Sequence, residues 1–210
     1  MLKQTLSLLC VSAIALSLTA CSMGPVASPP MKTYTINQLP TQPLAPINTN
    51  RSIVVMPMVA TRGFDNSNMI YQTKAYQLNT FAENAWIAPP ATMLTTLMSR
   101  TLQQSGAFRA VVAGPTISAT GFTINSTLLN LYQDFSVNPS QIVLTIDTDL
   151  VQNSDNKVIV NKLFQAHIPT KENNPYGGVE AANQASADIM SQITAMVTKA
   201  IQKQNQASDS

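Results

Sequence analysis

Residues 122–168 read FTINSTLLNLYQDFSVNPSQIVLTIDTDLVQNSDNKVIVNKLFQAHI, and this stretch decides the fold. Apolar residues largely alternate with polar ones along three runs, which is the period of strands that bury one face and expose the other. A polar cluster at 152–156 separates the last two runs and is typical of a turn. The pattern predicts three consecutive antiparallel strands at 122–137, 142–150 and 158–168.

The first of these strands changes phase near its middle. Phe122, Ile124 and Leu128 share one parity, whereas the apolar residues from Leu129 onward mostly share the other. One extra residue on a strand produces such a change, because it moves the side chains that follow to the opposite face. We therefore expect a β-bulge at Leu128 and Leu129.

Two amphipathic helices are predicted outside this stretch. Pro89 and Pro90 suit the start of a helix and Gly106 its end, and apolar residues recur at helical spacing over 90–105. A second apolar face runs along 179–202. Together these elements predict the α+β class: a largely antiparallel sheet with two main helices packed on it, preceded by a lipidated, flexible N-terminal leash.

Shorter elements are expected before and after the first helix. Residues 53–59 form a β-branched, apolar run in which Pro57 favours an edge position or a bulge. The other predicted segments are a loop at 62–68, a hairpin formed by 69–72 and 76–78, a strand at 108–112 and a loop at 171–178.

The N-terminus has the features of a secretion signal. Lys3 precedes an apolar segment from Leu6 to Leu18, which is too short to cross a bilayer as a helix. Small residues then precede Cys21, as at the cleavage site of bacterial lipoproteins. We predict that Cys21 becomes the mature N-terminus and receives a diacylglyceryl group and an N-acyl chain. This covalent lipid is the only cofactor that the sequence predicts.

Ser22 follows the lipidated cysteine. Bacterial lipoproteins with Asp at this position are commonly retained at the inner membrane, whereas Ser usually directs them to the outer membrane. We therefore expect a protein that is anchored by lipid on the periplasmic face of the outer membrane, with Ser22 as its sorting residue.

The chain divides into four parts. Residues 1–20 are the signal peptide, and residues 21–50 are a proline-rich leash with one short strand at 34–36. Residues 51–203 form the folded domain, and residues 204–210 are a polar tail. The leash is short, so we expect the domain to remain close to its membrane.

Composition excludes several classes of function. Only 10% of the residues are charged, and the 12 Lys and Arg nearly balance the 10 Asp and Glu. No basic stripe with interleaved aromatic residues is present, so nucleic acid is not an expected partner. Cys10 lies in the segment that is removed and Cys21 carries lipid, which leaves no cysteine for a disulfide or a metal site.

Few residues could carry catalysis. His167 is the only histidine and has no carboxylate at a supporting spacing. Asp147 and Asp149 share one strand face, which is more often a solvated surface than an acid–base pair. Gly177 and Gly178 precede a helix, where a turn explains them as well as an anion site does. We predict that the protein is not an enzyme and binds no metal.

Aromatic residues are the best candidates for partner binding. Tyr71, Tyr76, Phe81 and Trp86 lie close together in the chain, where they either fill the core or anchor a partner. Phe64 lies in a predicted loop, so we expect its side chain to be exposed, and we expect the Trp86 ring to be half accessible. The predicted partner-binding residues are Phe64, Tyr71, Phe81 and Trp86.

The same region carries a family resemblance. The segments concerned are Met69-Ile70-Tyr71, Tyr76-Gln77-Leu78, Phe81-Ala82, Trp86, Pro89-Pro90, Met93-Leu94, Leu97, Leu102 and Ser105-Gly106-Ala107-Phe108. Their order resembles that of the ABC-type transport auxiliary lipoprotein family, and the likeness extends over nearly the whole mature chain. Residues 63–70 depart from it, since family members often carry Leu-Asp-Arg-Pro-Gln and Val-Arg there.

The resemblance implies a function that composition and periodicity do not show. It implies a non-catalytic periplasmic accessory of transporters that pair an ABC pump with a lipid-binding Mce-type protein. It also implies a ring-like homo-oligomer that receives the Mce protein at the outer membrane. Two alternatives are a monomeric carrier that holds one lipid in a methionine-rich cavity and a structural lipoprotein that braces cell-wall machinery.

Overall fold

The computed structural model describes residues 29–41, 48–115 and 121–208. Its helices and strands belong to one compact unit that begins at Met31. Their bounds are β1 (Lys32–Tyr34), β2 (Ser52–Val55), β3 (Val59–Ala60), β4 (Asn68–Lys74), β5 (Gln77–Trp86), α2 (Pro90–Gln104), β6 (Ala110–Ala113), β7 (Phe122–Asp134), β8 (Gln141–Gln152), β9 (Lys157–Pro169) and α3 (Pro175–Ser208). These elements confirm the α+β class, with a mixed, largely antiparallel sheet.

The meander formed by β7, β8 and β9 contains the longest strands of the sheet. β7 pairs with β8, and β8 with β9, in antiparallel register over nearly their full lengths. Leu128, Ile146 and Phe164 are register partners across the three strands, and all three are at most 1% exposed. The register of β7 against β8 shifts between Leu128 and Asn130, which confirms the predicted bulge.

Three short strands share the other edge of β7 in series. β2 pairs with residues 122–124, β3 with residues 127–128 and β4 with residues 133–134, and all three run parallel to β7. The predicted strand at 53–59 is therefore two strands. Pro57 lies in the gap between them, because it has no N–H to donate to a sheet.

The hairpin of β4 and β5 is longer than the sequence pattern predicts, and β5 also pairs in parallel with β1. β1 lies in the segment that was predicted to be a leash. Ile36, just after β1, is only 2% exposed and belongs to the core. The predicted leash boundary at residue 50 is therefore too late, since the folded unit already begins at Met31.

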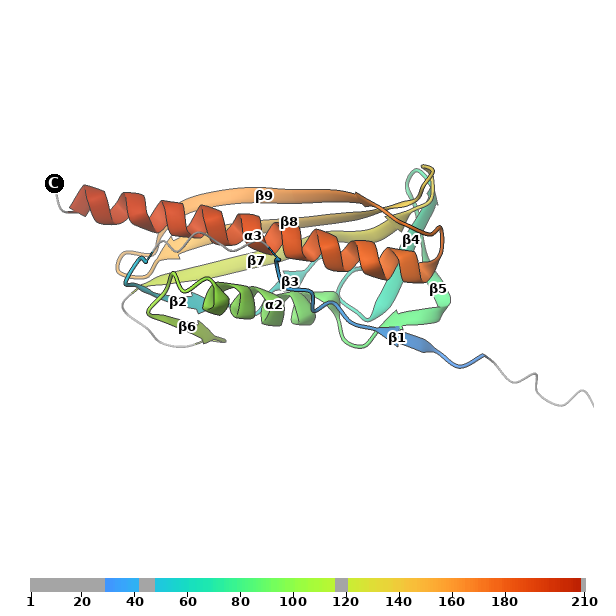
Figure 1. Ribbon diagram of the computed structural model, residues 1–210, viewed down its shortest axis with the longest axis horizontal. Helices are drawn as coiled ribbons and strands as arrows, with labels where there is room; N and C mark the ends of the chain where they lie inside the picture. Colours follow the sequence, from blue (N-terminus) through green and yellow to red (C-terminus); the bar gives the residue numbers. More distant parts are fainter. Residues whose placement is uncertain (1–28, 42–47, 116–120, 209–210) are drawn as a thin grey trace, which may run out of the picture. The chain divides into compact units, whose positions relative to one another are not determined.

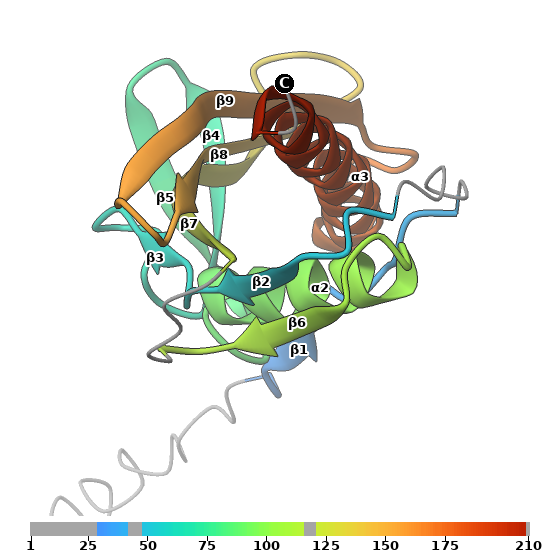
Figure 2. The same ribbon diagram turned by 90° about the vertical axis from the view of Figure 1, so that its left-hand side faces the viewer.

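Both helices cover the same side of the sheet, as predicted. α2 packs against β2 and β6, α3 packs against β8 and β9, and the two helices contact each other. Seen from one end in Figure 2, the sheet curves around the core and the helices lie on its open side. Fully buried side chains fill the space between them, including Leu94, Leu97, Leu102, Ile124, Leu144, Leu150, Ile189, Ile193 and Val197. In the described part of the chain, neither helix has the length and apolar character needed to cross a membrane.

α3 begins at Pro175, which is earlier than the predicted start at residue 179. The side-chain oxygen of Asn174 accepts a hydrogen bond of 2.8 Å from the N–H of Gly177 in the first helical turn. Asn174 therefore acts as the N-cap, and Pro175 occupies the first helical position, where its missing N–H costs nothing. Gly177 and Gly178, which were predicted to lie in a loop, are helical.

Candidate functional site

Several connections meet at the end of the folded unit where α3 begins (Figure 1). The N–H of Phe135, just after β7, donates a hydrogen bond of 2.7 Å to the carbonyl oxygen of Gln72 in β4. The Nε2 of Gln133 donates one of 3.2 Å to the carbonyl oxygen of Asn174 at the start of α3. These bonds hold the hairpin, the β7–β8 loop and the start of α3 together, and two candidate binding surfaces lie here.

The first surface is the exposed, apolar end of the β4–β5 hairpin with the adjoining β7–β8 loop, which we name the tip surface. It comprises Tyr71, Tyr76, Leu78, Phe81, Phe135 and Val137. Tyr76 is fully exposed, Leu78 is 49% exposed and Val137 is 43% exposed. Exposed apolar groups of this size, gathered at one place, are typical of an interaction site.

Three aromatic rings form the side of the tip surface. The ring centroids of Tyr71 and Phe81 are 4.5 Å apart, and Phe135 meets Tyr71 edge-on at 6.0 Å. All three side chains are half-buried. The pair from β4 and β5 is therefore held rigidly by a residue from the β7–β8 loop, and it keeps part of its apolar area accessible.

The backbone at Tyr76 is unusual. Its φ angle is 69°, in the left-handed region that favours Gly, Asn and Asp. The turn between β8 and β9 has a residue in the same region, with φ of 56°, and there the chain uses Asn156. Tyrosine at position 76 therefore costs backbone energy without any packing in return, which indicates that its exposed ring is needed for something outside the chain.

Asp134 fixes the start of the β7–β8 loop. Its carboxylate accepts a hydrogen bond of 2.9 Å from the N–H of Ser136 and one of 2.6 Å from the Ser136 hydroxyl. Burial tends to raise the pKa of Asp134, but these hydrogen bonds outweigh burial and hold the pKa below its usual value. Burial of the Tyr132 hydroxyl, together with the nearby negative charge of Asp134, raises the pKa of Tyr132.

Two of the predicted partner-binding residues are not accessible. Phe64 is 9% exposed and Trp86 is 4% exposed, and both belong to the core, so the expected exposure of these side chains is wrong. The N–H of Phe64 donates to the carbonyl oxygen of Thr61 in a tight turn, and that of Trp86 donates to Ser67. Loop 62–68 is thus closed onto the core, and composition alone does not show this. Tyr71 and Phe81 do lie at the tip surface, whereas Cys21 and Ser22 lie outside the described residues.

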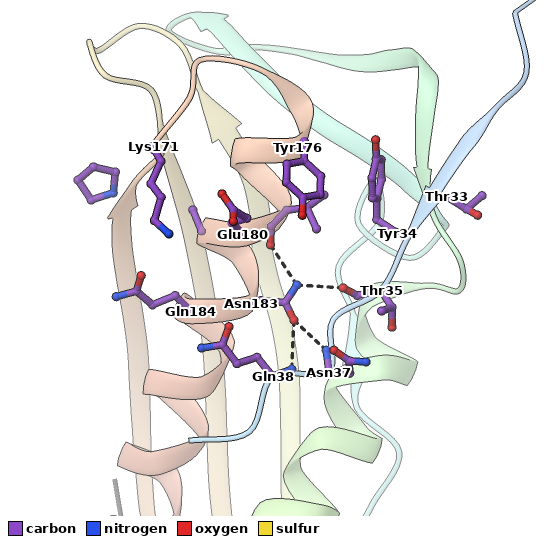
Figure 3. Close-up of a pocket in the computed structure, with 13 residues that line it drawn as sticks. Thr33, Tyr34, Thr35, Asn37, Gln38, Lys171, Tyr176, Glu180, Asn183 and Gln184 are labelled. Carbon is purple, nitrogen blue, oxygen red and sulfur yellow. Dashed lines mark hydrogen bonds between the residues drawn. The ribbon is translucent and has the colours of Figure 1, made fainter. Parts of the chain in front are cut away.

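The second surface is a groove of about 570 Å³ between α3 and the segment of residues 32–40, which we name the strap (Figure 3). Tyr34 of the strap and Tyr176 of α3 face each other with ring centroids 6.1 Å apart. The rest of the lining is mainly polar, with Lys171 and Glu180 as its charged groups. A volume of this order is within the range of small-molecule sites.

Asn183 of α3 holds the strap in place, as the dashed lines in Figure 3 show. Its side-chain oxygen accepts hydrogen bonds from the N–H groups of Asn37 and Gln38, at 2.9 and 3.1 Å. Its Nδ2 donates to the carbonyl oxygen of Thr35 at 2.9 Å and to that of Val179 at 3.0 Å. One amide thus supplies the backbone partners that a neighbouring strand would otherwise provide.

Replacing Asn183 by alanine is expected to release the strap and to lower the free energy of unfolding by about 1–3 kcal/mol, since each lost hydrogen bond contributes about 0.5–1.5 kcal/mol. Hydrogen exchange at the amides of Asn37 and Gln38 measures the release. Gln184→Ala is the matched control, because Gln184 is exposed and lines the same groove. Unchanged exchange in Asn183→Ala would show that other contacts hold the strap.

The residues that the sequence offered as candidates for catalysis lie on the surface of the sheet. His167 is exposed on β9. Asp147 and Asp149 both accept hydrogen bonds from the Nδ2 of Asn161, at 3.0 and 2.7 Å, on the exposed face of the sheet. In residues 29–41, 48–115 and 121–208 no cluster of three or more His, Cys, Asp and Glu could hold a metal ion.

The glycine pair in α3 has a steric explanation. A Cβ atom at Gly177 would collide with the carbonyl oxygen of Glu172, and one at Gly178 would collide with the Gln133 side chain. Gly177 thus needs glycine so that α3 can start close against the preceding loop, whereas a larger residue at position 178 would displace the Gln133 amide. This close approach accounts for the pair without an anion.

Several residues of these surfaces were missed from the sequence. Tyr34, Tyr176 and Asn183 are far apart in the chain, and no local pattern connects them. Phe135 and Val137 were assigned to a strand, although they follow its end. Tyr76 was predicted to begin the second strand of the hairpin, whereas it lies in the turn between β4 and β5, where glycine or asparagine is usual.

Comparisons with known proteins agree on the family and the fold. A family model described as ABC-type transport auxiliary lipoprotein component matches residues 34–194. A crystal structure of XCC0632 from Xanthomonas campestris, described as a DUF330 protein, is similar with a TM-score of 0.72 and 17% identity, over 84% of this chain and 99% of that one. An uncharacterized protein has a TM-score of 0.66 at 15% identity, over 80% of this chain and 99% of that one. A comparison with curated protein sequences found no match.

Proposed function

Because this chain belongs to the family of ABC-type transport auxiliary lipoprotein components, we propose that it docks onto the substrate-binding protein of its transporter through the tip surface. The partner in this proposal is a protein of the Mce type, and the transported substrate is a lipid that moves between the two membranes. The protein contributes binding and positioning, and no catalytic step.

Tyr76 is the observation that carries this proposal. Its ring is fully exposed, and its backbone has a conformation that tyrosine disfavours. Tyrosine is one of the residues that most often dominate binding energy at protein interfaces, where its ring enters a pocket and its hydroxyl finds a partner. Leu78 and the Tyr71–Phe81 pair lie on opposite faces of the same hairpin and would add apolar contact area on both sides of the turn.

Anchoring and assembly complete the proposal. We infer that lipid on Cys21 holds the protein to the periplasmic face of the outer membrane, with Ser22 as the sorting signal. We also infer a homo-oligomer, because β1, β3, β6 and β9 each pair with only one strand of the described sheet, which leaves an edge that another copy could use. A native mass spectrum that contained only the monomer would contradict the oligomer.

Replacing Tyr76 by asparagine tests the docking role. Asparagine tolerates the left-handed backbone better than tyrosine, so the free energy of unfolding should be unchanged or slightly higher. Loss of a central tyrosine should weaken capture of the Mce-type partner by about tenfold or more, which corresponds to about 1.4 kcal/mol or more of binding energy. The measurements are the affinity for the partner and the thermal melting temperature, each compared between the unmodified full-length protein and the Tyr76→Asn variant.

Leu163→Asn is the matched control for this experiment. Leu163 is 55% exposed on β9, so its replacement also removes an exposed apolar side chain, but it does so outside the tip surface. Its partner affinity should equal that of the unmodified protein. Normal capture by a folded Tyr76→Asn protein would remove the tip surface from the interface.

A further inference from the structure

A second groove lies between β9 and the C-terminal half of α3, and neither the family nor the docking role accounts for it. Its volume is about 490 Å³. We name it the lysine groove, and its lining residues are Ile159, Val160, Lys162, Met196, Lys199, Ala200, Lys203 and Gln204. The lining combines an apolar floor with three charged residues, which are all lysines.

Sequence spacing brings these groups together. Met196, Lys199, Ala200 and Lys203 recur every three or four residues, so they share one face of α3. Val160 and Lys162 share one face of β9 with the buried Phe164. This is the face that packs towards α3, so the strand and the helix supply the two walls of the groove.

Lys162 is positioned at the groove by a contact with an aromatic ring. Its Nζ lies 4.9 Å from the centroid of the Phe164 ring, a cation–π geometry, and that ring is 1% exposed. The lysine stem covers apolar surface while its ammonium group remains accessible to solvent.

Ordinary structural roles explain each lysine alone but not the three together. A charge on the inward face of an edge strand discourages aggregation, and lysines near the C-terminus of a helix interact favourably with its dipole. Neither role explains why three lysines line one groove together with apolar side chains that are only half-buried, such as Val160, Met196 and Ala200. An anion bound in this groove would be attracted by all three charges.

We propose that the lysine groove binds a single anionic phospholipid, with one acyl chain along the apolar floor and the phosphate between Lys162, Lys199 and Lys203. An acyl chain matches the floor, and a head group with net negative charge matches the rim. An acidic peptide would leave the apolar floor unmatched, and a zwitterionic lipid would leave the lysine charges uncompensated. This proposal does not depend on docking through the tip surface.

Native mass spectrometry of the full-length lipidated protein in a neutral sugar detergent tests the proposal. The probes are palmitoyl-lysophosphatidylglycerol and palmitoyl-lysophosphatidylcholine, which share one acyl chain but differ in head-group charge. The unmodified protein should bind one molecule of the anionic probe per chain, about tenfold more tightly than the zwitterionic probe. Equal binding of the two probes would overturn the proposal.

Two variants locate the binding. Lys199→Gln/Lys203→Gln removes two rim charges and should lower the affinity for the anionic probe about tenfold. Ala200→Trp should block the apolar floor while the three lysine charges stay in place. Lys74→Gln/Arg100→Gln is the matched control, because it removes the same charge from exposed positions outside the groove. Thermal melting verifies that each variant is folded. Unchanged binding in either groove variant, if it is folded, would overturn the assignment.

The two proposals fail separately. Tyr76→Asn should bind the anionic probe as the unmodified protein does, because Tyr76 is not part of the lysine groove. The double lysine variant should capture the transporter partner normally. A loss of both activities in both variants would show that the two surfaces are not independent, and it would overturn the separation made here.

Discussion

Replacing Leu97 or Ile193 by alanine is expected to lower the free energy of unfolding by about 2–5 kcal/mol for each variant. Leu97 is 1% exposed in α2 and Ile193 is fully buried in α3, and both belong to the core between the helices and the sheet. Truncation removes buried methyl groups and leaves a cavity that the surrounding elements fill only in part. Chemical denaturation of the full-length protein measures the loss.

Exposed positions on the same helices provide the controls. Arg100→Ala in α2 and Gln192→Ala in α3 should change the free energy of unfolding by less than about 0.5 kcal/mol, because both side chains are exposed. If Leu97→Ala behaved like Arg100→Ala, α2 would not pack on the sheet as described. The same comparison between Ile193 and Gln192 tests α3.

Replacing Cys21 by alanine is expected to abolish lipidation entirely. Alanine has no thiol to accept the diacylglyceryl group, and without acyl chains the mature domain loses its firm membrane anchor, since each buried methylene group contributes about 0.8 kcal/mol. The protein should either leave the membrane fraction or accumulate with its signal peptide uncleaved. Labelling with radioactive palmitate, together with the mass of the chain, distinguishes these two results.

Cys10→Ala is the control for this experiment. Cys10 lies in the middle of the apolar segment of the predicted signal peptide, so its replacement should leave lipidation and processing unchanged. Palmitate that remained on the Cys21→Ala protein would show that another residue is the acceptor. If the lipid anchor brings the protein to its partner as proposed, Cys21→Ala should also reduce partner capture in cells, whereas the purified variant should still bind.

Periodicity predicted those parts of the fold that depend on local pattern. The alternation along 122–168 determines the meander and its bulge, because one face of each strand must be buried. The stripe over 90–105 determines α2 in the same way. The start of α3 was missed although Asn174 and Pro175 are a recognisable capping pair, since the following glycines favoured a loop.

The sequence predicts a short strand at 34–36, close to β1, but the place of the strap in the folded unit could not be predicted, because the partners that stabilise it lie far along the chain. β1 pairs with β5, and Asn183 bonds to residues 35–38 over almost 150 residues of sequence. Ile36 looks like an isolated apolar residue among prolines until α2 and α3 cover it.

The candidate site was predicted only in part. Tyr71 and Phe81 remain partly exposed at the tip surface, and their role in partner binding stays a prediction. The exposure of Phe64 and Trp86 was predicted wrongly, because burial of an aromatic residue near a turn depends on how the turn folds onto the core. The lysine groove could not be predicted from the sequence, since Lys162 and Lys203 line the same groove only when α3 packs on β9.

The series of short strands along β7 has a consequence for how the chain reaches its native state. The meander closes through short turns, whereas Val55 must find Ile124, and Tyr71 must find Gln133, across a long intervening chain. Closing a longer loop costs more chain entropy, so β7 to β9 assemble before their edge is filled. Synthesis proceeds in the opposite direction, from the N-terminus, so β2, β3 and β4 exist before β7 does. During that interval β2 can pair with β6 and β4 with β5, but the edges of β2, β3 and β4 that will meet β7 have no partner. We expect the newly made chain to be most prone to aggregate at this stage.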